Sequence, residues 1–521
     1  MSDEENAVSE TNAPVRETGR PVAADIVVVG SGPVGSAAAT RLALLRPEAS
    51  VLVLEVGPWL PGTAGVNVKN VPDLEQRAAM QVRSQGPIQQ SYGVSVLQDR
   101  TRRAAREGSD VLARPGTFLL SALGGAPGGM PAAALSSNVG GMGVHWTCAC
   151  PWPYGSERTD LLSADEWSSS LQEARSLLRV TQNAFPATAT GERVLAGLRE
   201  EYPDAVKIGR GPTTMPLAVS PGEHREWTGP AKIWEQLPSD AKVRLRAETL
   251  VTRLIVEGDD VRGVEVRDVP TGETWRIDAR LVFVAADSFR TPQLLWASGI
   301  RPQALGRYLN DHTQVMSLVD VDFDEPQERA SGDDDPLAGV YWLPFSDEVH
   351  PFHGQIMHFE LSPVPLTGEV RNANTQTVGL GYFVPKDLRP EDRIVFSESR
   401  RDFYGMPAMT VEYGLTEVDE ERIELAKTYM RRSAAAIGRL REPDPFLLLQ
   451  PGSSLHYQGT VRMGATDDGT SVTDGTCRVW GLSNLYLGGN GVIPTPTAGN
   501  PTLTSVALAL RAAEAAAKSL S

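Results

Sequence analysis

Short, largely apolar runs near the start of the chain predict buried strands. Residues 24–30 and residues 51–55 are two such runs, and an Ala- and Leu-rich segment from Gly35 to about Leu45 separates them. Runs of this length that are rich in β-branched residues are typical of strands covered on both faces, as in a parallel sheet. The pattern therefore predicts a β–α–β unit.

The same pattern returns later in the chain. Residues 281–286 predict another buried strand, followed by a helix to about Ser298, and residues 485–487 predict a strand that leads into a long Ala- and Leu-rich helix. We expect Asn500 to cap that last helix and Pro501 to lie in its first turn. The unpaired N–H groups and the positive end of such a helix favour an anion, or a group that becomes anionic.

Weaker patterns fill the middle of the chain. Residues 244–266 alternate and turn at Gly258, as a hairpin would, and residues 160–185 form a helical stretch with capping signals. From residue 312 to residue 465, aromatic and strand-like segments predominate. We expect this part to form an antiparallel sheet that binds the substrate.

A glycine-rich turn joins the first strand to the first helix. Gly30, Gly32 and Gly35 have the spacing that permits a tight turn, a close approach of backbone to a pyrophosphate, and packing of helix on strand. Glu55 ends the next strand, where an acid accepts hydrogen bonds from a ribose hydroxyl. The motif by itself does not separate FAD from NAD. Its place near the start of the chain, together with the return of the chain in the last strand and helix, favours FAD.

Composition narrows the class of partner. The chain has 521 residues, of which 41% are hydrophobic and 22% are charged, and its net charge is −16. Such a charge argues against nucleic acid or an anionic membrane as a partner, because both require clustered Lys and Arg. The first residues are polar and acidic, without a secretory signal, and no apolar run has the length of a membrane span. We expect a soluble cytoplasmic protein with a small-molecule substrate.

The three cysteines, Cys148, Cys150 and Cys477, do not form a disulfide framework. The first two are one residue apart, which is too close for the usual Cys-x-x-Cys spacing, and no Cys/His cluster accompanies them. We expect buried, unreactive thiols and no metal site.

Several blocks of the sequence resemble the glucose-methanol-choline (GMC) oxidoreductase family. They are the turn 30–35, Glu55 with Gly57-Pro58, residues 288–300, and Gly-Arg-Tyr-Leu-Asn-Asp-His at 306–312. Four more blocks are similar to the pyranose oxidases and bacterial glycoside 3-oxidases of that family: residues 140–148, 350–355, 456–464 and 484–504. The blocks keep the family order over nearly the whole chain.

The resemblance implies FAD as the cofactor, and His145 stands where pyranose oxidases carry the flavin covalently. Thr147 would then lie against the N5/C4a region of the flavin. The backbone N–H groups implied to face the cofactor are those of Gly141, Met142 and Val144. Gly143 and Val144 depart from the polar residues usual in the fungal enzymes. The alternative is therefore a packed His145 beside Trp146, with an unlinked flavin.

Three further cofactor contacts follow from the resemblance. Val251 matches the position whose backbone meets adenine, and Asn490 stands where many family members have Asp at the pyrophosphate. Thr502 lies in the first turn of the helix that is implied to point at the flavin N1/C2 region. Without the resemblance, Val251 is one strand residue among several and Asn490 is a buried structural amide.

Oxidation of an alcohol needs a base for the hydroxyl proton, and histidine suits this role because its pKa is about 6.5. His456 matches the catalytic histidine of the family, and Asn500 matches the second member of its catalytic pair; resemblance rather than spacing selects both. We expect His224 and His350 to lie in polar loops, and His312 to be a turn residue.

The resemblance also implies the substrate contacts. Gln355 matches a glutamine that contacts the sugar in pyranose oxidases. His353 and His358 flank it, and they either line the substrate pocket or cap strands.

The implied fold class is α/β, a Rossmann-like FAD-binding domain with an inserted α+β substrate domain built on an antiparallel sheet. We expect a disordered tail at residues 1–22. The FAD-binding domain is assigned to residues 23–150, 245–311 and 466–521. The substrate-binding domain is assigned to residues 151–244 and 312–465. Residues 62–135, with the Gly/Ala/Pro-rich run 124–130, are a lid or an insertion.

The implied activity is the FAD-dependent oxidation of a secondary ring hydroxyl of a pyranose sugar or glycoside, at C3 or C2, to a ketone. Hydride passes to flavin N5, and O2 or a quinone reoxidises the flavin, giving H2O2 in the case of O2. The alternatives are a GMC oxidoreductase for a non-sugar alcohol, a non-catalytic flavin-binding protein and an NAD(P)-linked reductase. The protein is either a monomer or a homo-oligomer.

Overall fold

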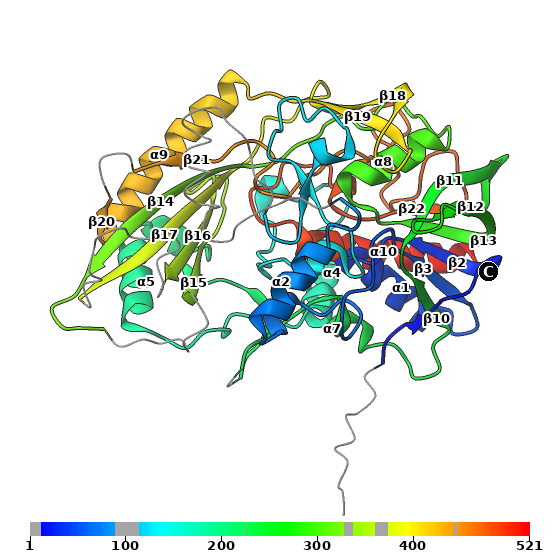
Figure 1. The fold of residues 1–521 in the computed structure, drawn as a ribbon. Coiled ribbons are helices and arrows are strands. Elements are labelled where there is room, and N and C mark those ends of the chain that lie inside the picture. Colours follow the sequence, from blue (N-terminus) through cyan, green and yellow to red (C-terminus); the bar gives the residue numbers. More distant parts are fainter. Residues whose placement is uncertain are drawn as a thin grey trace, which may run out of the picture.

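The computed structural model describes residues 12–88, 114–222, 224–327, 337–359, 374–441 and 445–520. They fold around two large β-sheets at opposite ends of the molecule, the first on the right and the second on the left of Figure 1. The first sheet is largely parallel and the second is antiparallel. The predicted fold class is confirmed.

The parallel strands of the first sheet come from both ends of the chain. β2 (Ala23–Val29), α1 (Pro33–Leu45) and β3 (Val51–Leu54) form the predicted β–α–β unit. β13 (Thr274–Val284) pairs with β2, and β22 (Leu485–Leu487) pairs with β13, both in parallel. The carboxyl ends of these strands therefore meet at one edge of the sheet, which is where open α/β sheets bind their ligands.

Two predictions about the edges of this sheet are wrong in detail. The hairpin consists of β11 (Thr249–Glu257) and β12 (Asp260–Asp268), whereas β10 (Val243–Arg246) is a separate strand parallel to β3. β1 (Val15–Arg16) pairs with β10, so residues 12–22 belong to the folded chain and not to a disordered tail. The tail prediction for residues 1–11 lies outside the described residues.

The second sheet has the strand order β20-β14-β17-β16-β15-β7, with β21 also paired to β14. Its strands are β7 (Thr213–Thr214), β14 (Thr313–Asp322), β15 (Leu337–Leu343), β16 (His353–Phe359), β17 (Thr375–Val384), β20 (Arg439–Leu440) and β21 (Leu447–Leu448). Helices α5 (Ala189–Glu201) and α9 (Glu417–Ile437) pack against one face of this sheet, around a core that contains Ile356 and Met430. Met357, the neighbour of Ile356 on β16, packs instead against the core of the first sheet. Because side chains alternate along a strand, the other residues on the Met357 side of β16 also face the first sheet.

Several helices pack on one another beside the first sheet. α10 (Thr502–Ser519) packs on α1 and on α4 (Ala164–Leu177), and α8 (Asp287–Ala297) follows β13 as predicted. α4 therefore lies with the first sheet, whereas α5 from the same stretch 151–244 lies with the second. The domain boundaries stay a prediction.

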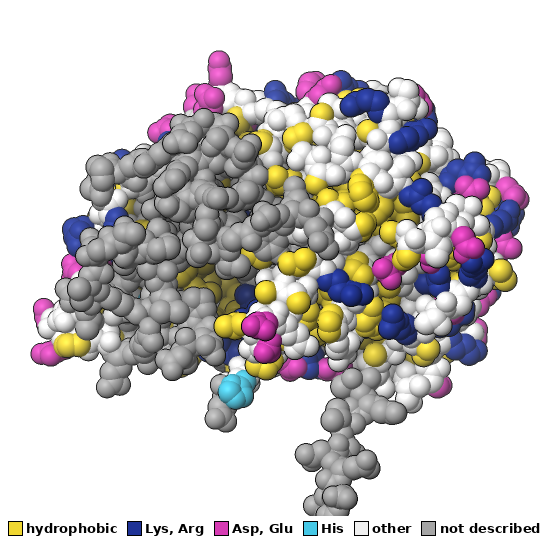
Figure 2. Space-filling view, viewed as in Figure 1, with side chains coloured by type: hydrophobic (Ala, Val, Ile, Leu, Met, Phe, Trp, Pro, Cys, Tyr) yellow, Lys and Arg dark blue, Asp and Glu magenta, His cyan; other side chains and the backbone are white. Residues whose placement is uncertain are grey.

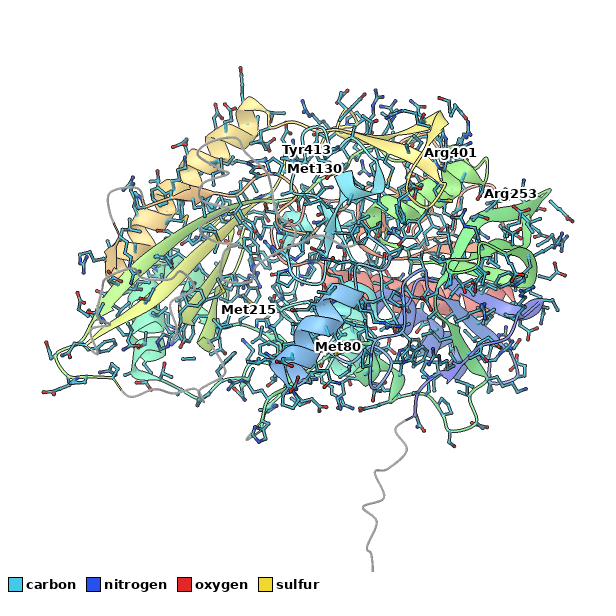
Figure 3. The ribbon with its side chains drawn as sticks, viewed as in Figure 1. Met80, Met130, Met215, Arg253, Arg401 and Tyr413 are labelled. Atoms are coloured by element: carbon cyan, nitrogen blue, oxygen red, sulfur yellow. The ribbon has the colours of Figure 1, made fainter. Side chains whose placement is uncertain are left out.

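Of the segment 62–135, residues 62–88 and 114–135 are described, and residues 89–113 lie outside the described residues. The role of this segment as a lid or an insertion stays a prediction. The Gly/Ala/Pro-rich run 124–130 forms backbone hydrogen bonds with β19 (Pro407–Glu412): Ala126 N–H donates to Met409 O, and Val411 N–H donates to Ala126 O. A side chain on Gly129 would meet the Tyr413 carbonyl oxygen at 1.8 Å. Figure 3 shows Met130 and Tyr413 beside one another at this junction. The glycines thus permit close backbone packing.

The remaining elements are short. They are α2 (Leu74–Arg83), α6 (Pro203–Lys207), α7 (Pro230–Trp234), β4 (Phe118–Leu119), β5 (Ala134–Leu135), β6 (Val180–Thr181), β8 (Leu217–Ser220), β9 (Glu226–Trp227) and β18 (Arg393–Arg401), with 3-10 turns at Val68–Asn70, Leu120–Leu123, η3 (Gly141–Val144), Gly155–Glu157 and η5 (Asn490–Val492). No helix in the described ranges is long and apolar enough to cross a membrane. In Figure 2, Lys and Arg side chains are interspersed with Asp and Glu side chains over the part of the surface that is not grey.

Candidate active site

The glycine-rich turn lies at the carboxyl edge of the first sheet, as predicted. Gly30 has a φ of +99°, and a side chain there would meet the Ala285 carbonyl oxygen, just beyond β13, at 2.3 Å. A Cβ on Gly35 would lie 2.0 Å from Gly30 O, so only glycine lets α1 pack this close. A Cβ on Gly32 would meet nothing nearer than 3.9 Å, and α1 has no side-chain cap. The turn therefore leaves open space at a bare helix N-terminus, as a pyrophosphate needs.

Glu55 is held in place by donors from this turn. Its Oε2 accepts hydrogen bonds from Ser31 Oγ (2.6 Å) and Ser31 N (3.1 Å), and its Oε1 accepts one from Gly57 N (2.9 Å). Burial raises the pKa of Glu55, and these bonds oppose that rise. A carboxylate has about four acceptor positions, so capacity for a ribose hydroxyl remains.

The turn η3 packs directly on the glycine-rich turn. Gly140 N donates to Ser31 Oγ (2.9 Å), and a side chain on Gly143 would meet Pro33 Cγ at 2.6 Å and Pro230 Cδ at 2.9 Å. The departure from the family pattern at Gly143 therefore has a steric cause in this chain: Pro33 and Pro230 leave no room for a side chain.

His145 follows η3, and its ring lies against Gly116, where an added Cβ would approach Nδ1 to 2.4 Å. Both ring nitrogens are buried and lack a hydrogen-bond partner among the described residues. Burial lowers the pKa of His145 to about 4, so the ring is neutral at neutral pH. Trp146 Nε1 donates to Thr228 O (2.6 Å), and Thr147 beyond it is exposed. Buried polar atoms are rarely left unpaired, so the ring nitrogens of His145 suit a contact with a bound ligand.

The predicted catalytic pair is brought together. His456 Nε2 lies 3.3 Å from Asn500 Nδ2, and Asn500 Oδ1 is buried without a partner in the part of the chain that the structure describes. The prediction that Asn500 caps the last helix is wrong: α10 begins at Thr502, and Pro501 occupies the cap position. The Asn500 side chain is directed at His456 instead, which is why it cannot cap the helix.

Glu157 fixes the loop that carries Asn500, and sequence reasoning missed it. Its Oε1 accepts hydrogen bonds from Ala498 N (2.8 Å) and Gly499 N (3.0 Å), while its Oε2 accepts one from Tyr154 N (3.0 Å). Burial raises the pKa of Glu157, and the three N–H donors oppose that rise. The bond from Tyr154 is local, but no local pattern marks a glutamate that also binds Ala498 and Gly499, more than 300 residues away.

His312 was expected to be a turn residue, and this prediction is wrong. Its Nε2 lies 2.7 Å from His456 Nδ1, its Nδ1 lies 3.3 Å from Thr497 O, and its ring stacks on Phe383 with centroids 4.9 Å apart. Burial lowers the pKa of His312 to about 4. The usable signal was its place in the block 306–312, directly before a buried strand.

His353 and Gln355 lie on the side of β16 that faces the first sheet. Trp342 Nε1 donates to His353 Nδ1 (3.1 Å), so the neutral ring carries its proton on Nε2. His353 Nε2 and Gln355 Oε1 are both buried without a partner in the described chain. His358 lies on the opposite side of the strand, with its Nε2 3.3 Å from Gln376 Oε1.

The remaining candidate residues are Val251, Asn490 and Thr502. Thr249 N–H donates to Glu55 O, which brings the start of β11, with Val251, beside the acid. Asn490 opens η5, and its Oδ1 accepts a hydrogen bond from Ser505 Oγ (2.6 Å) on α10. Thr502 is the first residue of α10. These positions suit the predicted cofactor contacts, which stay a prediction.

Two other histidines differ in environment. His224 is exposed. His350 is buried in an aromatic cluster that includes Tyr202 and Tyr382, so its expected polar loop setting is wrong. The three cysteines are free and buried, as predicted. Among the described residues, no group of three His, Cys, Asp or Glu side chains is placed to hold a metal ion.

Comparisons with known proteins identify the family of this chain. Models of the GMC oxidoreductase family match residues 223–314 and 393–509. A C-glycoside 3-oxidase of Arthrobacter globiformis is 44% identical over 96% of this chain and 96% of its own. A pyranose 2-oxidase of Tricholoma matsutake is 31% identical over 74% of this chain and 73% of its own. The crystal structure of pyridoxine 4-oxidase from Mesorbium loti superposes with a TM-score of 0.59 over 94% of this chain and 98% of its own, at 16% identity, and so shows the fold alone.

The chain belongs to the GMC oxidoreductase family. It is an oxidoreductase that acts on CH–OH groups with FAD as its cofactor. The open glycine turn and the unpaired His145 ring fit that cofactor.

Proposed function

We propose that this protein oxidises a secondary ring hydroxyl of a pyranose glycoside to a ketone, at C3. The observation that carries the proposal is His456 beside Asn500, with the His456 ring centroid 6.3 Å from that of Phe383 on β17. C3 is favoured over C2 because the match to a C-glycoside 3-oxidase is closer and longer than the match to a pyranose 2-oxidase.

His456 is the proposed general base. Its Nε2 takes the proton of the substrate hydroxyl, and burial lowers its pKa well below the usual value, so the ring is neutral and able to accept. Bound FAD supplies the two-electron acceptor that takes the hydride from the carbinol carbon. Asn500 Nδ2 points at the same Nε2 and would share the substrate oxygen with it.

The unpaired polar atoms support a sugar as the substrate. Within the described ranges, Asn500 Oδ1 and Gln355 Oε1 are acceptors without a donor, and His353 Nε2–H is a donor without an acceptor. Each sugar hydroxyl both donates and accepts, so neighbouring ring hydroxyls satisfy such a set. A hydrocarbon alcohol would leave these buried groups unpaired, at a cost of about 1–3 kcal/mol each. The site therefore suits a polyol better than a simple alcohol.

We infer that His145 carries the flavin covalently. A neutral imidazole with an unpaired nitrogen is a competent nucleophile, and burial keeps the His145 ring neutral. The new bond would replace a C–H bond of the flavin: its proton would be lost, and the two electrons would pass to the O2 or quinone that also reoxidises the flavin. Acid denaturation of the holoenzyme, followed by gel filtration, should leave the yellow colour with the polypeptide, and His145→Ala should release it. Colour that leaves with the small molecules in the wild type would contradict the linkage without touching the proposed reaction.

The proposed cofactor contacts are the backbone of η3 with Thr147, the turn 30–35 with Glu55, and Val251, Asn490 and Thr502. Reoxidation by O2, with release of H2O2, or by a quinone completes the cycle. The oxidase names of both relatives favour O2.

Anaerobic titration of the holoenzyme with a panel of glycosides, free pyranoses and non-sugar alcohols tests the proposal. We expect flavin bleaching with glycosides, and a 3-keto product by NMR. Bleaching only by non-sugar alcohols would favour the alternative alcohol oxidoreductase, and no bleaching by any donor would leave a flavin-binding protein without this activity.

A further inference from the structure

The hydrogen bonds around His312 determine which nitrogen of that ring carries the proton. Its Nδ1 lies 3.3 Å from the carbonyl oxygen of Thr497, and a carbonyl oxygen can only accept. The low pKa of His312, about 4 through burial, keeps a single proton on the ring at neutral pH. The Nδ1–H tautomer follows, and Nε2 of His312 is therefore an acceptor.

The tautomer of His312 determines the tautomer of His456. The 2.7 Å contact between His312 Nε2 and His456 Nδ1 needs one donor, and His312 Nε2 has no proton to give. His456 must donate from Nδ1, which leaves its Nε2 as a lone pair. Asn500 Nδ2, 3.3 Å away, is a donor that fits this lone pair. One proton arrangement thus satisfies all three contacts, whereas the reverse arrangement sets a lone pair of His312 against the Thr497 carbonyl.

We propose that His312 is a positioning residue that holds His456 in the Nδ1–H tautomer, with Nε2 free to act as the base. The inference rests on the proposed function of His456. Free histidine in water favours the opposite tautomer, in which Nε2 carries the proton and cannot accept another. An outer partner that fixes the tautomer of a working histidine is a general device of metal sites and catalytic triads.

His312 is a neutral partner, in contrast to the carboxylate of a triad. Stacking on Phe383 and the Thr497 carbonyl hold the ring in one orientation. When His456 gains the substrate proton, its Nδ1–H becomes a charge-assisted donor to the same His312 nitrogen. The bond therefore strengthens as the reaction proceeds, without an added negative charge beside the cofactor.

Two variants distinguish the effect of losing the hydrogen-bond acceptor of His312 from the effect of changing the volume of its side chain. His312→Gln keeps an acceptor oxygen near the position of Nε2 and an amide donor for Thr497, whereas His312→Leu keeps volume and removes both. We expect His312→Leu to lower the rate of anaerobic flavin reduction on the order of 10- to 100-fold, the range typical of partners that orient a functional histidine, and to leave the sugar dissociation constant unchanged. His312→Gln should restore most of the rate. His350→Leu, which removes a buried ring from the aromatic cluster, is the matched control and should react like the wild type.

The direct readout is the tautomer, which needs no turnover. Holoenzyme labelled with nitrogen-15 histidine gives two-bond proton–nitrogen correlations that distinguish Nδ1–H from Nε2–H, and His456→Gln assigns the His456 signals by their loss. We expect Nδ1–H for His456 in the wild type and in His312→Gln, and Nε2–H in His312→Leu. An Nε2–H His456 in the wild type, or an unchanged tautomer in His312→Leu, overturns the proposal even if the enzyme oxidises glycosides. An inactive wild type with the expected tautomers would overturn the proposed function alone.

Discussion

At the residue scale, the chemistry depends on where single protons lie. The half-buried His456 has Asn500 on one side and His312 on the other. Its backbone N–H donates to Ser454 Oγ (3.0 Å), and Ser454 Oγ in turn donates to the Asp311 carboxyl. Both the ring and the backbone of His456 are therefore held before substrate arrives, which is what a base with little freedom to reorganise requires.

Replacing the base tests its role. His456→Gln keeps a polar side chain but removes the group that accepts the proton, so flavin reduction by a glycoside should fall about 10²–10⁴-fold while flavin absorbance is retained. Stopped-flow spectrophotometry without oxygen measures the rate. His224→Gln, at an exposed histidine, serves as the control and should be neutral. Equal rates in the two variants would remove His456 from the mechanism.

The buried carboxyl of Asp311 makes the free energy of unfolding depend on pH. Burial raises the pKa of its carboxyl to about 7, above the value of about 3.9 for an unfolded chain. The folded state therefore holds this proton more tightly, so the stabilisation is complete below about pH 4 and is lost as pH rises to about 7, by roughly 1.4 kcal/mol per pH unit.

Asp311→Asn cannot titrate, so we expect the difference in unfolding free energy between wild type and variant to fall over that window and to be constant above it. Denaturant unfolding at several pH values measures this difference. A difference that rises with pH would show that the folded carboxyl is ionised and stabilised, contrary to this account.

At the scale of elements, the site depends on close contacts between turns. η3 meets the start of α1 through Gly143, which lies against Pro33 and Pro230, and Ser31 connects Gly140 to Glu55. The local pattern predicted α1, β2 and β3 because their apolar runs report burial directly. It could not predict that Pro501 would take the cap position of α10, because the competing partner of Asn500 lies 44 residues away.

Gly143→Ala tests the contact of η3 with α1. The new Cβ would stand 2.6 Å from Pro33 Cγ, so η3 must shift away from the glycine-rich turn, and we expect weaker FAD retention and a lower melting temperature, in keeping with the roughly 1–3 kcal/mol cost of overpacking. The ratio of flavin to protein absorbance after dialysis measures retention. Gly222→Ala, where the nearest atom is 3.4 Å away, is the matched control. Full retention in Gly143→Ala would mean that this packing does not shape the cofactor site.

At the scale of the whole molecule, the fold brings residues from distant parts of the chain to one place. The turn at 30, η3 at 141, β16 at 353, His456 and the start of α10 all contribute to the site. Sequence reasoning found the candidate residues through resemblance, and the structure joins His456 to Asn500. Sequence reasoning did not identify His312 or Glu157 as part of the site, because their contacts form only in the folded chain.

The assignment of segments to the two domains also depends on contacts between distant elements. Apolar runs predicted the parallel sheet, and the aromatic and strand-like segments of residues 312–465 predicted the second sheet; both sheets are present. The stretch 151–244 was assigned to one domain, but α4 packs on α10 while α5 packs on α9. A helix pattern predicts that a helix buries one face, and it does not predict which sheet that face will cover.

In the proposed reaction, His456 removes the hydroxyl proton while the hydrogen on C3 of a glycoside leaves as hydride. Anaerobic reduction of the holoenzyme by a glycoside deuterated at C3, compared with the same glycoside deuterated at C2, tests both halves of this reaction. We expect bleaching that is slowed several-fold by deuterium at C3 and unaffected by deuterium at C2, with a 3-keto product. Slowing by deuterium at C2 alone, or a rate that depends on neither label and yields no keto sugar, would contradict it.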